Sequence, residues 1–175
     1  MVGAGSYAAA QSLSARPVAR LIGDVSSNSR PRGAYVPSSP SIDDATAAER
    51  RAFEVTNKER VKNGLAALVW DSELCRLART HSRNMSVLGF FSHQTPEGLR
   101  LRERARAANL RYQVIAENIA YNQGYDDPGA FAVERWMISP GHRANLLSPE
   151  FQSSAIGSFV APDGTVFLTQ LFIVR

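Results

Sequence analysis

Hydrophobic positions recur at helical spacing in several separate stretches of the chain. From Ser72 to Leu88, apolar side chains fall three or four residues apart, which is the spacing of one buried helix face. That face comprises Leu74, Leu77, Ala78, His81, Met85 and Leu88. An earlier run of strong helix formers, Ala45 to Asn63, follows the capping pair Asp43-Asp44 and ends at Gly64. The pattern therefore predicts a helix in each of these two stretches.

Two further helices are indicated by start signals that contain proline. Thr95-Pro96-Glu97 supplies a cap, a proline for the first helical position and an acidic residue for the first turn. This signal predicts a helix that continues to about Ala108. Asp127-Pro128 repeats the arrangement and predicts a helix from Ala130 to Ile138.

Strand-like patterns dominate the C-terminal part of the chain. Ser154 to Val160 and Thr165 to Val174 are rich in β-branched and aromatic residues and flank the turn Pro162-Asp163-Gly164, which predicts an antiparallel hairpin. A third strand is expected near Tyr112 to Ala120. Because both faces of the second hairpin arm are largely apolar, helices should cover both sides of the sheet. The expected fold class is α+β, a three-layer α-β-α sandwich with a small antiparallel sheet between helices.

Composition divides the chain into a tail and one domain. Residues 1–42 are rich in Ser, Ala, Arg and Pro and predict an extended or disordered tail or linker, whereas residues 43–175 carry the periodic patterns. No apolar run is long enough to cross a bilayer, and the first residues do not form a complete signal peptide. The lone cysteine, Cys75, excludes an internal disulfide framework and is expected to be a buried small hydrophobe.

The charge of the chain is moderately basic, and most of the excess is arginine. Twenty Lys and Arg against 16 Asp and Glu give a formal net charge of +4. The densest group belongs to the predicted third helix and is interpreted as a solvated helix face, with contact to an anionic surface as the alternative. It comprises Arg100, Arg102, Arg104, Arg106 and Arg111. No nucleic-acid motif accompanies it, so binding of DNA or RNA is not expected.

Candidate chemistry is concentrated between Phe90 and Asn145. His93 follows Phe90-Phe91-Ser92, two aromatics expected to be buried and to anchor its loop. His142 lies in Pro140-Gly141-His142-Arg143, where a tight turn is expected to present the ring, and Glu117-Asn118 is a polar pair in an apolar segment. Two imidazoles and a carboxylate fit a zinc site with an open position, but a network that fixes loops by hydrogen bonds fits equally well. His81 is interpreted as a core histidine and is left out of this group.

The ordered set of motifs resembles the CAP superfamily, also called cysteine-rich secretory, antigen 5 and pathogenesis-related 1 proteins or SCP domains, and looks like a bacterial-type member. The resemblance covers about Ala45 to Arg175. It is carried by Trp70-Asp71, His81-Ser82, Phe91-Ser92-His93, Glu117-Asn118, Trp136-Met137 with Ser139-Pro140-Gly141-His142-Arg143-x-Asn145, Ile156-Gly157 and Thr169-Gln170.

The resemblance implies a central cleft whose ligand-binding residues are His93, Glu117, Asn118 and His142, with His93 and His142 as candidate ligands of zinc or another divalent cation. It also implies export to the cell envelope or the medium. One departure concerns the second cleft acid of many eukaryotic members, because that position is Ser139 here. The missing carboxylate should lower metal affinity and puts a two-carboxylate acid/base scheme in doubt.

Three functions follow as hypotheses. The favoured one is a secreted or cell-envelope binding module for a small molecule, lipid, peptide or cell-wall glycan, with or without a metal. The second is a zinc-dependent hydrolase in which His93 and His142 hold the metal and Glu117 completes the site or activates water. The third is a structural domain in which the same residues only brace loops. No HExxH helix and no serine-nucleophile motif is present, which favours binding over catalysis.

Overall fold

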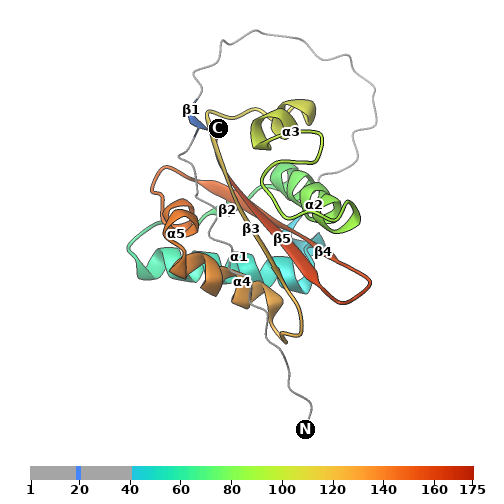
Figure 1. Ribbon diagram of the computed structural model, residues 1–175. Helices are drawn as coiled ribbons and strands as arrows, with labels where there is room; N and C mark the ends of the chain where they lie inside the picture. Colours follow the sequence, from blue (N-terminus) through green and yellow to red (C-terminus); the bar gives the residue numbers. More distant parts are fainter. Residues whose placement is uncertain (1–18, 21–40) are drawn as a thin grey trace.

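The computed structural model describes residues 19–20 and 41–175, and the greater part of the predicted tail lies outside these residues. In the described chain, helices alternate with short strands in an order typical of an α+β fold (Figure 1). The helices are η1 (Ile42–Asp44), α1 (Ala47–Lys62), α2 (Ser72–Val87), α3 (Leu101–Ala107), α4 (Pro128–Ile138) and α5 (Pro140–Leu146). The strands are β1 (Ala19–Arg20), β2 (Val69–Trp70), β3 (Val114–Asn122), β4 (Ser153–Val160) and β5 (Val166–Val174).

The strands form one sheet in the order β1-β3-β5-β4-β2. The hairpin β4–β5 pairs antiparallel from Ser153↔Ile173 to Val160↔Val166, and β3 pairs antiparallel with the other side of β5. The hairpin and the third strand predicted from the sequence are therefore present. One pairing corrects the expectation of a purely antiparallel sheet, because β2 lies parallel to β4. The sheet is mixed, since the chain crosses from α1 to α2 through β2 in the direction of β4.

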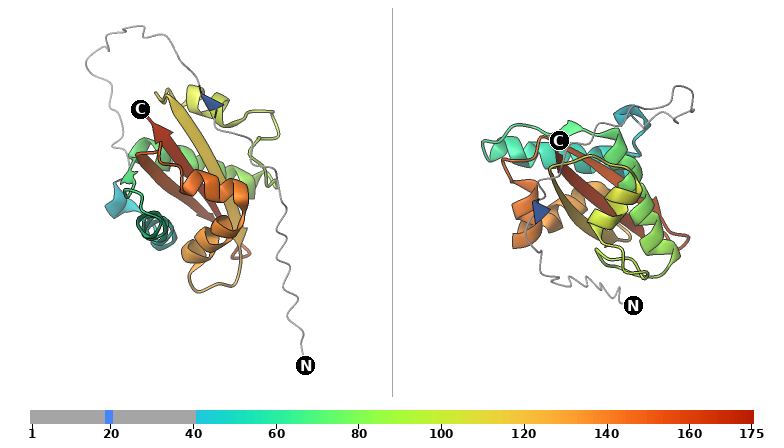
Figure 2. Two further views of the ribbon diagram at one scale, coloured as in Figure 1. Left: turned by 90° about the vertical axis from the view of Figure 1, so that its left-hand side faces the viewer. Right: turned by 90° about the horizontal axis from the view of Figure 1, so that it is seen from above.

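Helices cover both faces of the sheet, as the three-layer sandwich requires. Helices α2 and α3 lie on one face and α1, α4 and α5 on the other (Figure 2). Each interface has its own apolar core. Residues of β3 alternate between them, since Ile115 packs with α2 and α3 whereas Ala116 packs with α1 and α4. This alternation directs the neighbouring residues Glu117 and Asn118 to opposite faces of the sheet.

Three helix boundaries differ from the prediction. Helix α1 is capped by Thr46, whose hydroxyl accepts from the Glu49 amide at 3.2 Å, and the pair Asp43-Asp44 lies in η1 instead. Helix α3 begins at Leu101 rather than at Thr95, because the Thr95 amide donates to the Leu99 carbonyl at 2.9 Å and closes a turn. The predicted tight turn after Pro140 is a helix, α5. In the first two cases a local hydrogen bond competes with the signal that the sequence pattern suggested.

Gly157 on β4 lies where the backbone of α2 packs tightly against the sheet. A Cβ added at this position would lie 2.7 Å from the Ala78 Cβ and closer still to the α2 backbone at Ala78 and Arg79. We expect Gly157→Ala to destabilise the domain by about 2–3 kcal/mol, because α2 must move away from β4. Urea unfolding measures this change, and Gly98→Ala is not a suitable control because its positive φ adds strain. Ser158→Ala, one residue further along, retains the backbone contact and should have a smaller effect.

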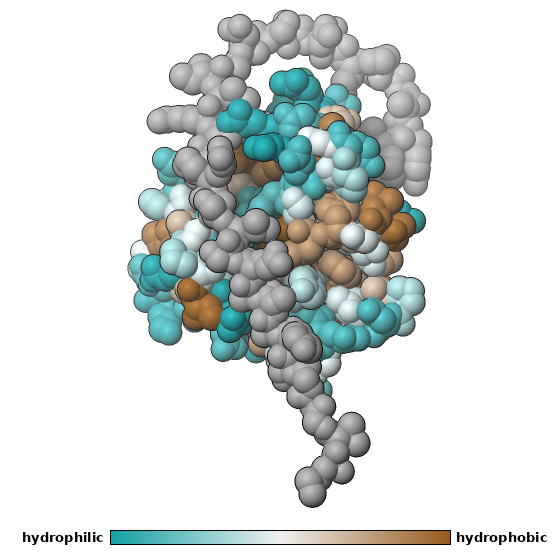
Figure 3. All heavy atoms as spheres, viewed as in Figure 1, coloured by the Kyte–Doolittle hydropathy of each residue, from teal (hydrophilic) through white to brown (hydrophobic). Residues whose placement is uncertain are grey.

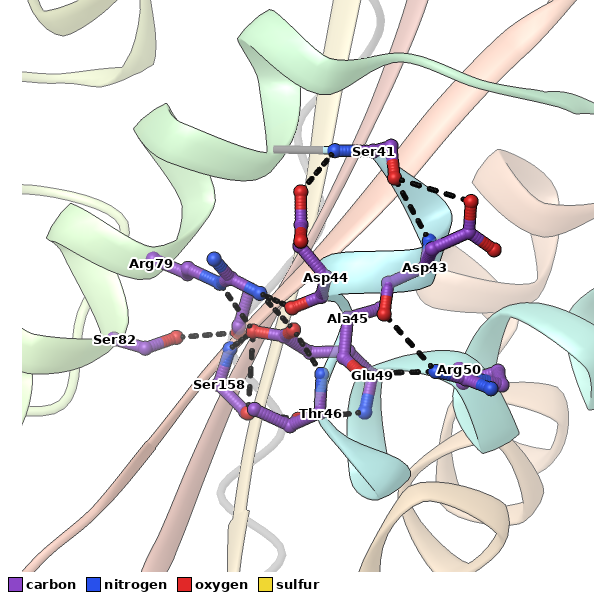
Figure 4. Close-up of polar contacts among 11 residues, drawn as sticks. Ser41, Asp43, Asp44, Ala45, Thr46, Glu49, Arg50, Arg79, Ser82 and Ser158 are labelled. Carbon is purple, nitrogen blue, oxygen red and sulfur yellow. Dashed lines mark hydrogen bonds and ion pairs between the residues drawn. The ribbon is translucent and has the colours of Figure 1, made fainter. Parts of the chain in front are cut away.

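A buried ion pair connects the two helical layers at the β4 side of the sheet (Figure 4). Glu49 of α1 is fully buried, and its carboxylate accepts from the Arg79 guanidinium of α2 at 2.6 and 2.8 Å. The same carboxylate accepts from the amides of Thr46 and Ser158, each at 2.8 Å. Burial alone would raise the pKa of Glu49, but these hydrogen bonds outweigh it and lower the pKa. Glu49 thus holds α1, α2 and β4 together.

Candidate functional site

The centre of the candidate site is Glu117, a buried carboxylate on β3. Its side chain is 3% exposed and points toward the α2 and α3 layer, where Arg104 Nη2 contacts its two oxygens at 2.8 and 3.0 Å. His93 Nδ1 contacts Oε1 at 2.8 Å. Burial favours the protonated acid, but the charge of Arg104 and the hydrogen bond from His93 outweigh it and lower the pKa of Glu117 to about 2. The carboxylate is therefore ionised at neutral pH and accepts the Nδ1–H of His93.

His81 of α2 forms a hydrogen bond to the loop that carries His93. His81 is fully buried, and its Nε2–H donates to the Ser92 carbonyl at 3.0 Å. Burial lowers the pKa of His81 to about 4, so the ring remains neutral and can keep this bond at neutral pH. His81 is thus the core histidine that the sequence indicates. The anchoring aromatics Phe90 and Phe91 are only partly buried, which corrects the expectation for them, and they pack on His81 and Tyr121.

On the opposite face of β3, Asn118 joins the site to α5. Its Nδ2 donates to the His142 carbonyl at 3.1 Å, and its Oδ1 accepts from Asn145 Nδ2 at 2.9 Å. Asn145 Nδ2 also contacts the Glu117 carbonyl at 3.3 Å. Since Glu117 and Asn118 are adjacent in β3, these contacts bring His93 and His142 to the two sides of one strand. Of the four residues singled out in the sequence, His93 and Glu117 therefore lie together on one face of the sheet, and Asn118 and His142 lie together on the other.

The two histidines present ring nitrogens that the described protein does not use. His93 Nε2 and both ring nitrogens of His142 have no hydrogen-bond partner among residues 41–175, and none of these atoms is buried. Burial of the ring, followed by the charge of His93, lowers the pKa of His142. His142 is therefore neutral at neutral pH and can both donate and accept a hydrogen bond. The arrangement offers polar contacts to a ligand on a framework that is already hydrogen-bonded.

The donor set fits a metal centre poorly. Across the described part of the chain, no group of three or more His, Cys, Asp or Glu side chains is arranged to hold a metal ion. Glu117 already accepts from Arg104 and His93, and a cation beside Arg104 would be repelled by the guanidinium. The imidazoles of His93 and His142 remain, fewer than the three protein ligands of a catalytic zinc. Ser139, at the position of the absent second acid, lies at the junction of α4 and α5.

Arg104 is the site residue that sequence reasoning missed. It was grouped with the solvated arginines of its helix, but its side chain is 7% exposed and contacts Glu117. A signal was present, because Arg104 falls on the helical stripe of Leu101 and Ala105, and both of these pack against the α2 layer. An arginine on an apolar stripe requires a partner. Sequence alone does not specify Glu117 as this partner, because Glu97 and Glu103 lie nearer to Arg104 in the chain.

Comparison with known proteins identifies the family to which the chain belongs. Residues 53–172 match the model of the cysteine-rich secretory protein family, CAP, and the chain belongs to this family. The resemblance seen in the ordered sequence motifs is therefore confirmed. The expected α-β-α architecture is confirmed by solved SCP domains of the same fold.

Bacterial relatives are similar over most of the domain. The chain is 38% identical over 130 residues to the membrane protein YlbC and 35% identical over 128 residues to the protein YkwD, both of Bacillus subtilis. It spans 35% and 48% of their lengths, respectively, and 74% and 73% of the chain is aligned. An extracellular SCP-domain protein of Bacillus anthracis is 31% identical with a TM-score of 0.63, covering 73% of this chain and 40% of that one. In residues 41–175, no helix is long and apolar enough to span a membrane.

Proposed function

We propose that this chain is an extracellular or envelope-associated binding domain whose His93–His142 site takes a polar ligand from the cell wall. The observation that carries the proposal is the pair of imidazole rings with accessible nitrogens on either side of β3: Glu117 fixes the ring of His93, and Asn118 fixes the backbone of His142. Membership of the CAP family and the similarity to an extracellular SCP-domain protein support the location. A peptide or a glycan matches the site, since both offer hydrogen-bond donors and acceptors to imidazole rings.

The hydrolase alternative is not favoured by the geometry. A metal-dependent reaction needs a third metal ligand, or a carboxylate that can activate water. The carboxylate of Glu117 instead accepts hydrogen bonds from His93 and Arg104. A purely structural role for these residues does not explain why ring nitrogens of His93 and His142 are exposed and lack a hydrogen-bond partner among residues 41–175. Binding by a preorganised polar surface accounts for both features.

Co-sedimentation with insoluble peptidoglycan, which carries both peptide stems and glycan strands, tests the proposal. We expect the wild-type protein to sediment with the wall and His93→Ala and His142→Ala each to weaken binding about tenfold, the loss of one to two hydrogen bonds. Addition of EDTA should leave binding unchanged, because the donor set does not fit a metal. Calorimetric zinc titration of the same three proteins checks this point independently.

Lys58→Ala serves as the matched control, because Lys58 is exposed on α1 in the opposite layer from His93. Its binding should equal that of the wild type. If the wild-type protein stays in the supernatant, or if all four proteins sediment equally, the proposed wall ligand or the proposed site is wrong. Thermal unfolding of each variant separates loss of binding from loss of fold.

A further inference from the structure

The charges of the domain are distributed unequally between its layers. Residues 71–111, which contain α2 and α3, carry eight arginines, no lysine and four carboxylates, a net charge of +4. The remaining described segments, 41–70 and 112–175, carry eight basic and eleven acidic residues, a net charge of −3. One face of the sandwich is therefore basic although the domain as a whole is close to neutral.

Most of these arginines are not used to hold the fold. Arg79 and Arg104 are paired with Glu49 and Glu117, but the other six have no side-chain hydrogen bond or ion pair within residues 41–175. The six are Arg76, Arg83, Arg100, Arg102, Arg106 and Arg111, of which only Arg102 is partly buried. Two of the four nearby acids, Asp71 and Glu73, are already neutralised by Arg175. The positive charge on this face therefore faces solvent.

An exposed apolar surface adjoins the basic face. Val87 and Leu88 at the end of α2 are 56% and 50% exposed, and Leu99 before α3 is 42% exposed. Tyr121, packed edge to face on Phe91, is 40% exposed. Figure 3 shows hydrophobic surface gathered beside the end of α2 and hydrophilic surface above it over α3, on the same side of the molecule. Aliphatic and aromatic side chains thus lie next to unpaired arginines.

We propose that this α2–α3 face docks on the surface of an anionic phospholipid bilayer. Arginine binds lipid phosphates bidentately and keeps its charge at all physiological pH values. Val87, Leu88 and Leu99 would enter the boundary between headgroups and acyl chains, where Tyr121 is also favoured. A soluble acidic polymer would satisfy the arginines alone and leave the exposed aliphatic side chains in water. The bilayer is the partner that uses both surfaces.

Vesicle co-sedimentation of the full chain tests this docking. We expect binding to phosphatidylcholine vesicles that contain about one third phosphatidylglycerol, and little binding to pure phosphatidylcholine. Each arginine contributes about a fivefold change in partition, so the double variant Arg102→Glu and Arg106→Glu should bind roughly 25-fold more weakly or worse. Raising the salt concentration should weaken wild-type binding, whereas moving from mildly acidic to mildly alkaline pH should not.

Matched variants separate the two components of the surface. Lys58→Glu with Lys62→Glu reverses two charges on α1, in the other layer, and should change binding less than about twofold. Val87→Ser with Leu88→Ser should keep the salt dependence but lower binding about tenfold, because aliphatic area no longer enters the bilayer.

Three outcomes would overturn the inference. They are equal binding to neutral and anionic vesicles, undiminished binding by the Arg102→Glu and Arg106→Glu double variant, or binding to soluble polyphosphate without binding to vesicles. The last result would assign the face to an acidic polymer. Circular dichroism of each variant confirms that the fold is retained.

Discussion

Glu49→Ala is expected to destabilise the protein by about 3–5 kcal/mol, the usual effect of removing one partner from a buried ion pair. The carboxylate is fully buried and accepts from Arg79, from the Thr46 amide and from the Ser158 amide. Its removal leaves Arg79 without its ion-pair partner and leaves the Ser158 amide without an acceptor. Three elements, α1, α2 and β4, lose their shared contact at once. Urea unfolding monitored by tryptophan fluorescence measures the change.

Glu54→Ala on the same helix is the control, because Glu54 is exposed and approaches Arg51 only at 3.9 Å. It should change the free energy of unfolding by less than about 0.5 kcal/mol. Similar losses for the two variants would show that the Glu49 contacts do not stabilise the sandwich. The pH dependence adds a second check. Because the folded pKa of Glu49 is lowered, its contribution is complete above the unfolded value near 4.5 and is lost as the pH falls through the folded pKa.

Arg104→Met is expected to destabilise the domain by a similar amount, about 3–5 kcal/mol, because Glu117 keeps its buried charge without its main partner. The pKa of Glu117, held at about 2 mainly by the charge of Arg104, should rise in this variant. Since that folded value lies below the unfolded one, Glu117 stabilises the wild type above pH 4.5 and this contribution falls away as the pH drops toward 2. The acid-dependent part of stability should shrink in Arg104→Met.

A double variant tests whether the pair acts as a unit. Glu117→Gln in the Arg104→Met background removes the buried charge, so the double variant should be more stable than the sum of the two single changes implies. Arg106→Met is the matched control, because Arg106 lies on the same helix, is exposed and has no ion pair with the described residues. It should be within about 0.5 kcal/mol of the wild type. Equal losses for Arg104→Met and Arg106→Met would contradict the proposed role.

The Glu49–Arg79 and Glu117–Arg104 ion pairs stabilise the fold and order the site by the same interaction, a buried carboxylate paired with an arginine. Glu49 joins the helical layers beside β4, and Glu117 joins α3 and the His93 loop to β3. Both carboxylates are buried, and both are satisfied by an arginine and by a second donor. The Glu117 pair also fixes the ring of His93, so the packed interior extends to the surface at this residue.

Local patterns predicted those elements whose formation depends on neighbours in sequence. The apolar stripe of α2 and the hairpin flanking Pro162-Asp163-Gly164 appear nearly at the predicted bounds. The predicted start of α3 was wrong. The turn from Thr95 to Leu99 forms hydrogen bonds with backbone groups that would otherwise belong to the first helical turn. The cap of α1 was wrong because two acceptable capping sequences, Asp43-Asp44 and Thr46, lie within one turn of each other. A short-range signal does not distinguish between such alternatives.

By itself, the sequence determined the fold class and the family, because periodicity, turn chemistry and the order of motifs can be read along the chain without knowledge of its packing. Only the tertiary structure decided that Arg104, unlike the other arginines of its helix, pairs with Glu117, and that Glu49 pairs with Arg79. Burial and charge pairing depend on which segments pack together. An arginine or a glutamate carries the same letter whether it faces water or a partner across the sheet.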